Sequence, residues 1–270
     1  MAVAIPTSPY DPTPLEEQPL GNAPLVRVLA QIRHPALLSL ASDAATETAL
    51  RVAQSLSEGY PIFEAGRETA VIVTPEGVKE QKNSGASIWR LRDPKETWQV
   101  SFSKEFLAVE TSAYEGRTHF FQQLQAVLST YVEQVKPPSA TRIGVRYTNR
   151  VAEPQHLDRL KQLVRPELLG PVGTELPGSA RLLQTVSQAQ FSVPNGGSLL
   201  HWGLVPPNGA FDPTLTPLES QSWILDIDAF HSEKSPFEAK AITELARRLA
   251  VQAHTHFRWA VTEDFLRTYR

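Results

Sequence analysis

The sequence feature that most constrains the fold of this chain is an order of predicted secondary-structure elements that occurs twice. Each time, a strand and a helix come first, several short strands follow, and a long amphipathic helix ends the series. The long helices are expected at about 117–135 and from Ser235 onward, and two consecutive prolines separate the series. Short, turn-like connections favour antiparallel neighbours. The order therefore predicts an α+β protein of two fused, similar halves, 24–138 and 139–270.

Hydrophobic periodicity and turn residues place the individual elements. The first half has predicted strands at 25–34, 68–74, 86–92, 97–103 and 106–111, with a helix at 43–57. The second half has predicted strands at 141–151, 180–193, 199–205 and 222–230, with helices at 156–164, from Ser235 and from Thr262. Ser235, Pro236 and Glu238 have the spacing of a capping box, which predicts where the last long helix begins.

The first strand of each half alternates apolar and polar residues. Val28 and Ile32 share one side of the first, and Ile143 and Val145 share one side of the second. Such alternation is typical of a sheet that packs one face on a core and leaves the other face polar. We therefore expect antiparallel sheets with helices on one face, joined as in the fold typified by the TATA-binding protein. This likeness concerns architecture and implies no function.

The N-terminal segment and the overall composition narrow the class of protein. Residues 1–23 contain five prolines, which disfavour regular structure, so we expect a flexible arm there. The chain has no cysteine, which excludes disulfides, thiolate zinc sites and cysteine nucleophiles. No apolar run approaches the length of a membrane span, and the first residues lack a secretory signal pattern. We expect a cytoplasmic protein without a membrane partner.

A row of arginines is the strongest candidate for a binding site. Arg142, Arg146 and Arg150 lie on one face of the strand 141–151, and Arg27 and Arg33 lie on the corresponding face of the first strand. The planar guanidinium group forms paired, charge-assisted bonds to phosphates and carboxylates. Two other interpretations remain open: a solvated face with ion pairs, and a nucleic-acid surface. The net charge of −3 does not favour nucleic acid.

Two aspartates on one strand allow a second kind of site. Asp226 and Asp228 are two residues apart on strand 222–230, so they share a face. Paired carboxylates suit a divalent cation such as Mg²⁺, but such a site needs further ligands. The competing interpretation is ion pairing across the sheet with Arg142 or Arg146.

The remaining polar motifs do not form a catalytic set. His254 and His256 lie near the end of the last long helix, where we expect polar surface rather than a zinc site. Ser198 has no identifiable partner histidine or base. No glycine-rich nucleotide-binding motif occurs. We therefore expect neither a metal nor another cofactor.

Several segments resemble a known family. They are Gln31–Pro35, the stretches 106–114 and 165–170, "TRIGVRYTNRV" at 141–151, and "LDIDAF" at 225–230. The chain resembles an uncharacterised, sporadically distributed bacterial protein family of about 250 residues, and the likeness covers roughly 24–270. "RIGVRYTNR" is its most specific part, and His34 departs from the usual residue. The resemblance implies no activity and no catalytic residues, and patchy distribution suggests an accessory or defence role.

The leading hypothesis from the sequence is a non-catalytic binding module for an anionic ligand or a protein partner. The arginine row and the lack of a complete catalytic set support it. The alternatives are a metal-dependent hydrolase that uses Asp226 and Asp228, and a protein that binds nucleic acid on the sheet face. We also expect self-association, because curved sheets with free edge strands often pair.

Overall fold

The computed structural model describes residues 6–13, 15, 20–41, 45–67, 70–74, 77–81, 87–209, 212 and 214–270. Within these residues the main element is a nine-stranded sheet in which every neighbouring pair is antiparallel. Its strands, in spatial order, are β10 (Ser187–Val193), β11 (Gly196–Val205), β12 (Ser222–His231), β9 (Arg142–Val151), β1 (Leu25–Arg33), β7 (Phe106–Thr111), β6 (Trp98–Ser103), β5 (Ser87–Arg92) and β2 (Ile62–Arg67). The predicted α+β class with a large antiparallel sheet is confirmed.

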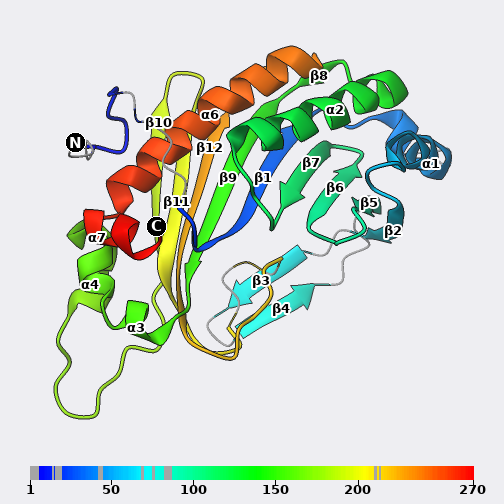
Figure 1. Cartoon of the computed structure of the whole chain (residues 1–270). Coiled ribbons are helices and arrows are strands. Elements are labelled where there is room, and N and C mark those ends of the chain that lie inside the picture. Colours follow the sequence, from blue (N-terminus) through cyan, green and yellow to red (C-terminus); the bar gives the residue numbers. More distant parts are fainter. Residues whose placement is uncertain are drawn as a thin grey trace.

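Three helices lie across one face of this sheet (Figure 1). They are α1 (Ala45–Leu56), α2 (Arg117–Val135) and α6 (Ala239–Ala260). The helix α6 packs on β9 and β12 and against α2, and α2 in turn packs against α1. The opposite face of the sheet, which we call the open face, has no such helical layer in Figure 1.

The core lies between the helices and the sheet, as the alternation of the strands predicts. On β1 the buried side chains Val28, Ala30 and Ile32 face this core. On β12 Leu225 and Ile227 do the same. Because side chains alternate along a strand, the intervening residues of β1, β9 and β12 project from the open face. The strands therefore deliver the arginines and aspartates singled out in the sequence to that face.

Smaller elements complete the described chain. They are the helices α3 (Pro154–Leu157), α4 (Leu160–Leu163), α5 (Pro166–Leu169) and α7 (Glu263–Thr268), the 3₁₀ turns η1 (Leu38–Leu40) and η2 (Gly170–Gly173), the pair β8 (Ser139–Ala140) with β13 (Ser235–Pro236), and the hairpin β3 (Ala70–Thr74) with β4 (Gly77–Gln81). None of the described helices has the length and apolar character that spanning a membrane requires.

Three details of the predicted elements are wrong. Residues 180–186 are not a strand: Leu183 and Val186 are exposed, and regular pairing begins only at Ser187. Ser235 and Pro236 do not begin the last long helix but form β13 against β8, and α6 begins at Ala239. The predicted helix at 156–164 is two short helices, α3 and α4.

Other predicted boundaries hold. Thr262 caps α7, since its hydroxyl accepts a hydrogen bond from the backbone N–H of Phe265. A tight turn at Pro194 and Asn195 joins β10 to β11, the elements that correspond to the predicted strands 180–193 and 199–205, and Asn195 takes the left-handed conformation that such a turn requires. Of the predicted strand 68–74, residues 68–69 lie outside the described part of the chain.

Candidate functional site

Three arginines and three aspartates form a network on the open face, which we call the Arg–Asp network. Its members are Arg27, Arg142, Arg146, Asp212, Asp226 and Asp228. The register between β12 and β9 creates much of it, because Asp226 lies opposite Thr148 and Asp228 lies opposite Arg146. Opposite charges on adjacent strands stabilise a sheet.

Asp226 is the most deeply buried acid of this network. It is 1% exposed, and both of its carboxylate oxygens accept from Nε of Arg146, at 2.8 and 2.9 Å. The hydroxyl of Thr148 donates a further bond at 2.8 Å. Burial alone raises the pKa of this carboxyl, but His201, Arg146 and Thr148 outweigh burial, so the pKa lies below its ordinary value. Asp226 is therefore an ionised, saturated acceptor.

Asp212 connects two of the arginines from outside the sheet. Its carboxylate lies 2.8 Å from Nη2 of Arg27 and 2.7 Å from Nη2 of Arg146. The backbone N–H and the hydroxyl of Thr214 also donate to it, and Arg27 donates to that hydroxyl. Burial opposes ionisation, but the two guanidinium charges prevail and lower the pKa of Asp212. The segment before β12 is thus fastened to the open face.

The third pair of the network is closer to solvent. Nη2 of Arg142 lies 2.7 Å from Asp228, and its guanidinium group lies over the ring of Phe230 at 4.7 Å. The predicted pairing of Asp226 and Asp228 with Arg146 and Arg142 is therefore confirmed. The described residues contain no group of three or more metal-ligating side chains of the kind that could hold an ion.

The other two arginines of the predicted row differ from these three. Arg33 is exposed and makes no side-chain hydrogen bond or ion pair with the described residues. Arg150 is 8% exposed. It donates from Nε to the hydroxyl of Ser222 at 3.0 Å and from Nη1 to the carbonyl of Thr216 at 2.6 Å. Burial lowers its pKa, and no ion pair with a carboxylate compensates within the described chain.

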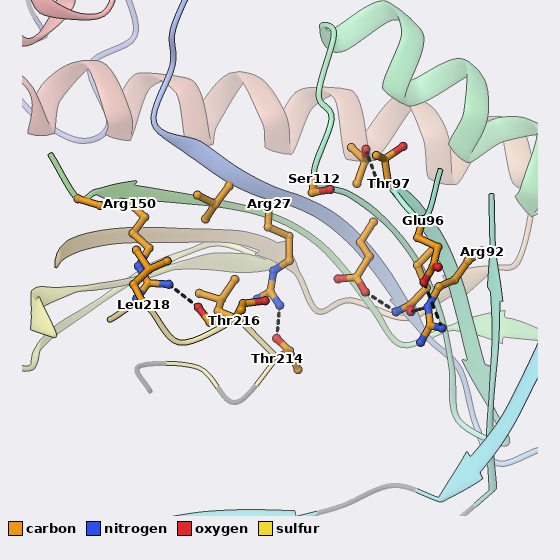
Figure 2. Close-up of a pocket in the computed structure, with 15 residues that line it drawn as sticks. Arg27, Arg92, Glu96, Thr97, Ser112, Arg150, Thr214, Thr216 and Leu218 are labelled. Atoms are coloured by element: carbon orange, nitrogen blue, oxygen red, sulfur yellow. Dashed lines mark hydrogen bonds and ion pairs between the residues drawn. The ribbon is translucent and has the colours of Figure 1, made fainter. Parts of the chain in front are cut away.

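A cavity of about 400 Å³ opens beside Arg150. Its floor is the open face, from β9 across β1, β7 and β6 to β5, and its outer wall is the segment 214–218. Figure 2 shows Arg150, Thr216 and Leu218 together at one end of this cavity, Arg27 with Thr214 in the middle, and Arg92 with Glu96 at the other end. Nε of Arg27 is buried and has no hydrogen-bond partner.

The cavity also contains a carboxyl group that the sequence did not single out. Glu110 of β7 accepts a hydrogen bond at 2.5 Å from the amide of Gln99 on β6. Burial raises the pKa of Glu110, and the charge of Arg27 only partly opposes this. Glu110 forms no ion pair with any other described residue. The alternation of strand 106–111 could have placed it on the polar face, but no sequence signal indicated a cavity there.

A second polar cluster lies on the covered face, between β11 and α6. Nδ1 of His256 donates to the Gln252 carbonyl at 2.9 Å, so Nε2 accepts from the hydroxyl of Ser198 at 2.6 Å. The hydroxyl of Tyr10 in turn lies 2.9 Å from Oγ of Ser198. The expectation of polar surface is wrong for His256, which is wholly buried, and Ser198 does have a histidine partner.

This cluster also anchors part of the N-terminal arm. The Tyr10 ring contacts those of His256 and Phe191 edge-on, with centroids 4.7 and 5.8 Å apart. Arg165 donates to the carbonyl of Pro6 at 2.6 Å. Ser198 and His256 are both fully buried, so the hydrogen bonds between them satisfy polar groups that water does not reach.

No protein-family model and no curated protein matches the chain. The family resemblance noted in the sequence therefore stays a prediction, and the geometry of the open face carries the functional argument.

Proposed function

We propose that this protein is a non-catalytic binding module for an anionic ligand, and that the ligand lies in the cavity against Arg150. The observation that carries the proposal is the environment of this guanidinium group. It is buried, yet the hydrogen bonds that it forms go to the uncharged oxygens of Ser222 and Thr216. A buried charge without a counter-ion is costly, so an anion entering the cavity gains a strong partner.

The pairing of the other arginines supports the choice of Arg150 as the anion site. Arg27, Arg142 and Arg146 each bind an aspartate of the Arg–Asp network, which already supplies their counter-charge. An anion at those positions would have to displace a carboxylate held by several bonds. Arg27 contributes to the cavity as a second lining cation, and its Nε is a hydrogen-bond donor without a partner.

No observation favours the two alternative functions. A metal-dependent hydrolase would need free oxygens on Asp226 and Asp228, but both oxygens of Asp226 accept bonds from Arg146 or Thr148, and one oxygen of Asp228 accepts a bond from Arg142. A nucleic-acid surface would need several unpaired cations on one face, and the Arg–Asp network balances three positive charges with three negative ones.

We also propose that 24–138 and 139–270 are structural repeats, arranged as in the TATA-binding protein. The strand order supports this. The first main-sheet strands of the two segments, β1 and β9, pair with each other. Each is flanked by the last strand of the nine-stranded sheet before the long helix of its own segment, β7 or β12. A rotation that superimposes β1, β7 and α2 on β9, β12 and α6 would test the proposal.

The expected self-association stays a prediction. Its support is the two edges of the sheet, β10 and β2, and the exposed Ile62 and Phe63 on β2. Light scattering coupled to size exclusion would contradict it by returning the mass of one chain, 29.9 kDa.

A titration of small anions tests the proposed function. We expect inorganic phosphate, sulfate or acetate to bind the wild-type protein by calorimetry. Loss of a charge-assisted bond costs about 1.5–3 kcal/mol, so Arg150→Gln should weaken binding by about 10- to 150-fold. Arg33→Gln removes the same charge from an exposed position and should leave the affinity unchanged. Equal effects of the two substitutions would contradict the proposal.

A further inference from the structure

The cavity has a second pole, opposite in charge to Arg150. Glu110 lines the same space, and its carboxyl accepts one hydrogen bond, from Gln99. No described residue bonds to the other oxygen of this carboxyl, and that oxygen is not fully buried. That oxygen therefore faces accessible space. Glu110 forms no ion pair with a described residue, although the charges of Arg27 and Arg90 act on it, and Arg150 likewise forms no ion pair with a described carboxylate.

The sheet keeps these two groups from pairing with each other. They come from β9 and β7, which flank β1, so two strand spacings of together about 10 Å separate them across the sheet. Along the strands they are offset as well, because the N–H of Arg150 bonds to Pro24, whereas Glu110 lies opposite Leu29. Arg146 of β9 also lies opposite Leu29, so Arg150 is four residues further along β9, which corresponds to roughly 13 Å.

Burial disfavours the charged form of both groups. Burial lowers the pKa of Arg150 and raises the pKa of Glu110, which means that each charge would be stabilised by an opposite charge placed beside it. A single ion satisfies only one pole. A ligand with an anionic group at one end and a cationic group at the other satisfies both.

We infer that the ligand is an elongated zwitterion, whose anionic group binds Arg150 and whose amino group binds Glu110. Two opposite charges about 10 to 16 Å apart are the pattern of the two termini of a short, extended peptide of three to five residues. This inference rests on the proposed function, because it takes the anion site at Arg150 as one of its two ends. The hydroxyl group of Ser112, which also lines the cavity, offers a hydrogen bond to a peptide group between the ends, whereas the hydroxyls of Thr97 and Thr111 already donate to Asp93 and to the Thr97 carbonyl.

Oligoglycines of two to six residues are suitable probes of the separation between the two sites, because they carry both terminal charges and no side chains. We expect calorimetry on the full chain to show the tightest binding at three to five residues. N-acetylation removes the ammonium charge and should weaken binding about tenfold, and C-terminal amidation removes the carboxylate and should weaken it at least as much. In Glu110→Gln the free and the N-acetylated peptides should bind equally.

Two controls separate the possible failures. Glu110→Gln must keep the circular dichroism spectrum of the wild type, and Glu233→Gln, which removes an exposed charge, should leave both the phosphate affinity and the acetylation penalty intact. Arg150-dependent phosphate binding together with equal affinity for free and acetylated peptides would overturn the zwitterion and leave the anion site standing. Phosphate and peptide binding that are both indifferent to Arg150→Gln would overturn the two proposals together.

Discussion

The two faces of the central sheet bury polar groups in different ways. On the covered face Ser198 and His256 are uncharged and satisfy each other under a layer of apolar side chains. On the open face charged groups are buried as well, and each carboxylate of the Arg–Asp network is matched to a guanidinium. Arg150 departs from this rule, since it is a buried charge of the open face without such a match. The contrast identifies Arg150 as the group with unused binding capacity.

The largest effect on stability should come from breaking the charge pairing of the open face at its most buried point. Asp226→Asn leaves Arg146 with one carboxylate fewer in a buried position. We expect the free energy of unfolding to fall by about 3–5 kcal/mol, measured by urea denaturation. Asp228→Asn, at the more exposed pair, should cost about 1 kcal/mol or less. Similar losses in both variants would contradict the distinction between buried and exposed pairs.

The covered face should lose stability in a different range of pH from the open face. Burial, opposed only by the carbonyl of Gln252, lowers the pKa of His256 to about 4, and burial with the charges of Arg117 and Arg258 lowers that of His254 to about 4. Between pH 6.5 and 4 the unfolded chain binds protons that the folded chain does not. As the pH falls through this range, the free energy of unfolding should therefore decrease by up to about 1.4 kcal/mol per pH unit for each histidine.

The Arg–Asp network of the open face should respond only at lower pH. The depressed pKa values of Asp212 and Asp226 stabilise the fold fully above about pH 4, the value of the unfolded carboxyl, and this contribution disappears as the pH falls further. Denaturant midpoints measured from pH 8 to pH 3 separate the two ranges. His256→Gln should flatten the curve above pH 4 and leave the part below pH 4 steep. A curve that His256→Gln and His254→Gln both leave unchanged above pH 4 would contradict this assignment.

Within the covered face, Ser198 should matter more than Tyr10. Ser198→Ala leaves Nε2 of His256 buried without a donor, which should cost about 1–3 kcal/mol. Tyr10→Phe removes one hydrogen bond but keeps the ring contacts with His256 and Phe191, so about 0.5–1.5 kcal/mol is expected. Thermal unfolding of the two variants measures the difference. A larger loss in Tyr10→Phe would show that the arm, rather than the serine–histidine pair, is the main support there.

The smallest effect on stability is expected at Arg150 itself. Arg150→Gln removes two hydrogen bonds to uncharged oxygens, but it also removes a buried, uncompensated charge, and the two effects offset each other. The free energy of unfolding should change by about 1 kcal/mol or less, whereas Arg146→Gln leaves two aspartates short of a partner and should cost about 3 kcal/mol or more. Comparable destabilisation in both variants would mean that Arg150 is part of the scaffold.

The sequence predicts the parts of this structure that depend on local periodicity. Alternation along 141–151 places three arginines on one face, and the two-residue spacing of Asp226 and Asp228 places both beside them. It does not predict Asp212, which lies in a proline-rich segment without periodicity and reaches Arg27 across 185 residues of chain. Nor does it predict that His256 is buried, because that depends on β11 and on Tyr10, which are distant in sequence.

Backbone pairing explains the errors in element boundaries. Ser235 and Pro236 have the spacing of a helix start, but β8 offers a strand partner that a local pattern does not reveal. The apolar residues of 180–186 suggest a strand, yet Leu183 and Val186 find no core to pack on and are exposed. In both cases tertiary contacts decide between local alternatives.

The most direct test of the account is a crystal structure of the wild-type protein soaked in selenate, an anion that anomalous scattering locates. We expect a selenium peak inside the cavity, within hydrogen-bonding distance of the Arg150 guanidinium, and no such peak in Arg150→Gln. A cavity without selenium in the wild type, with peaks only at exposed cations such as Arg33, would contradict it.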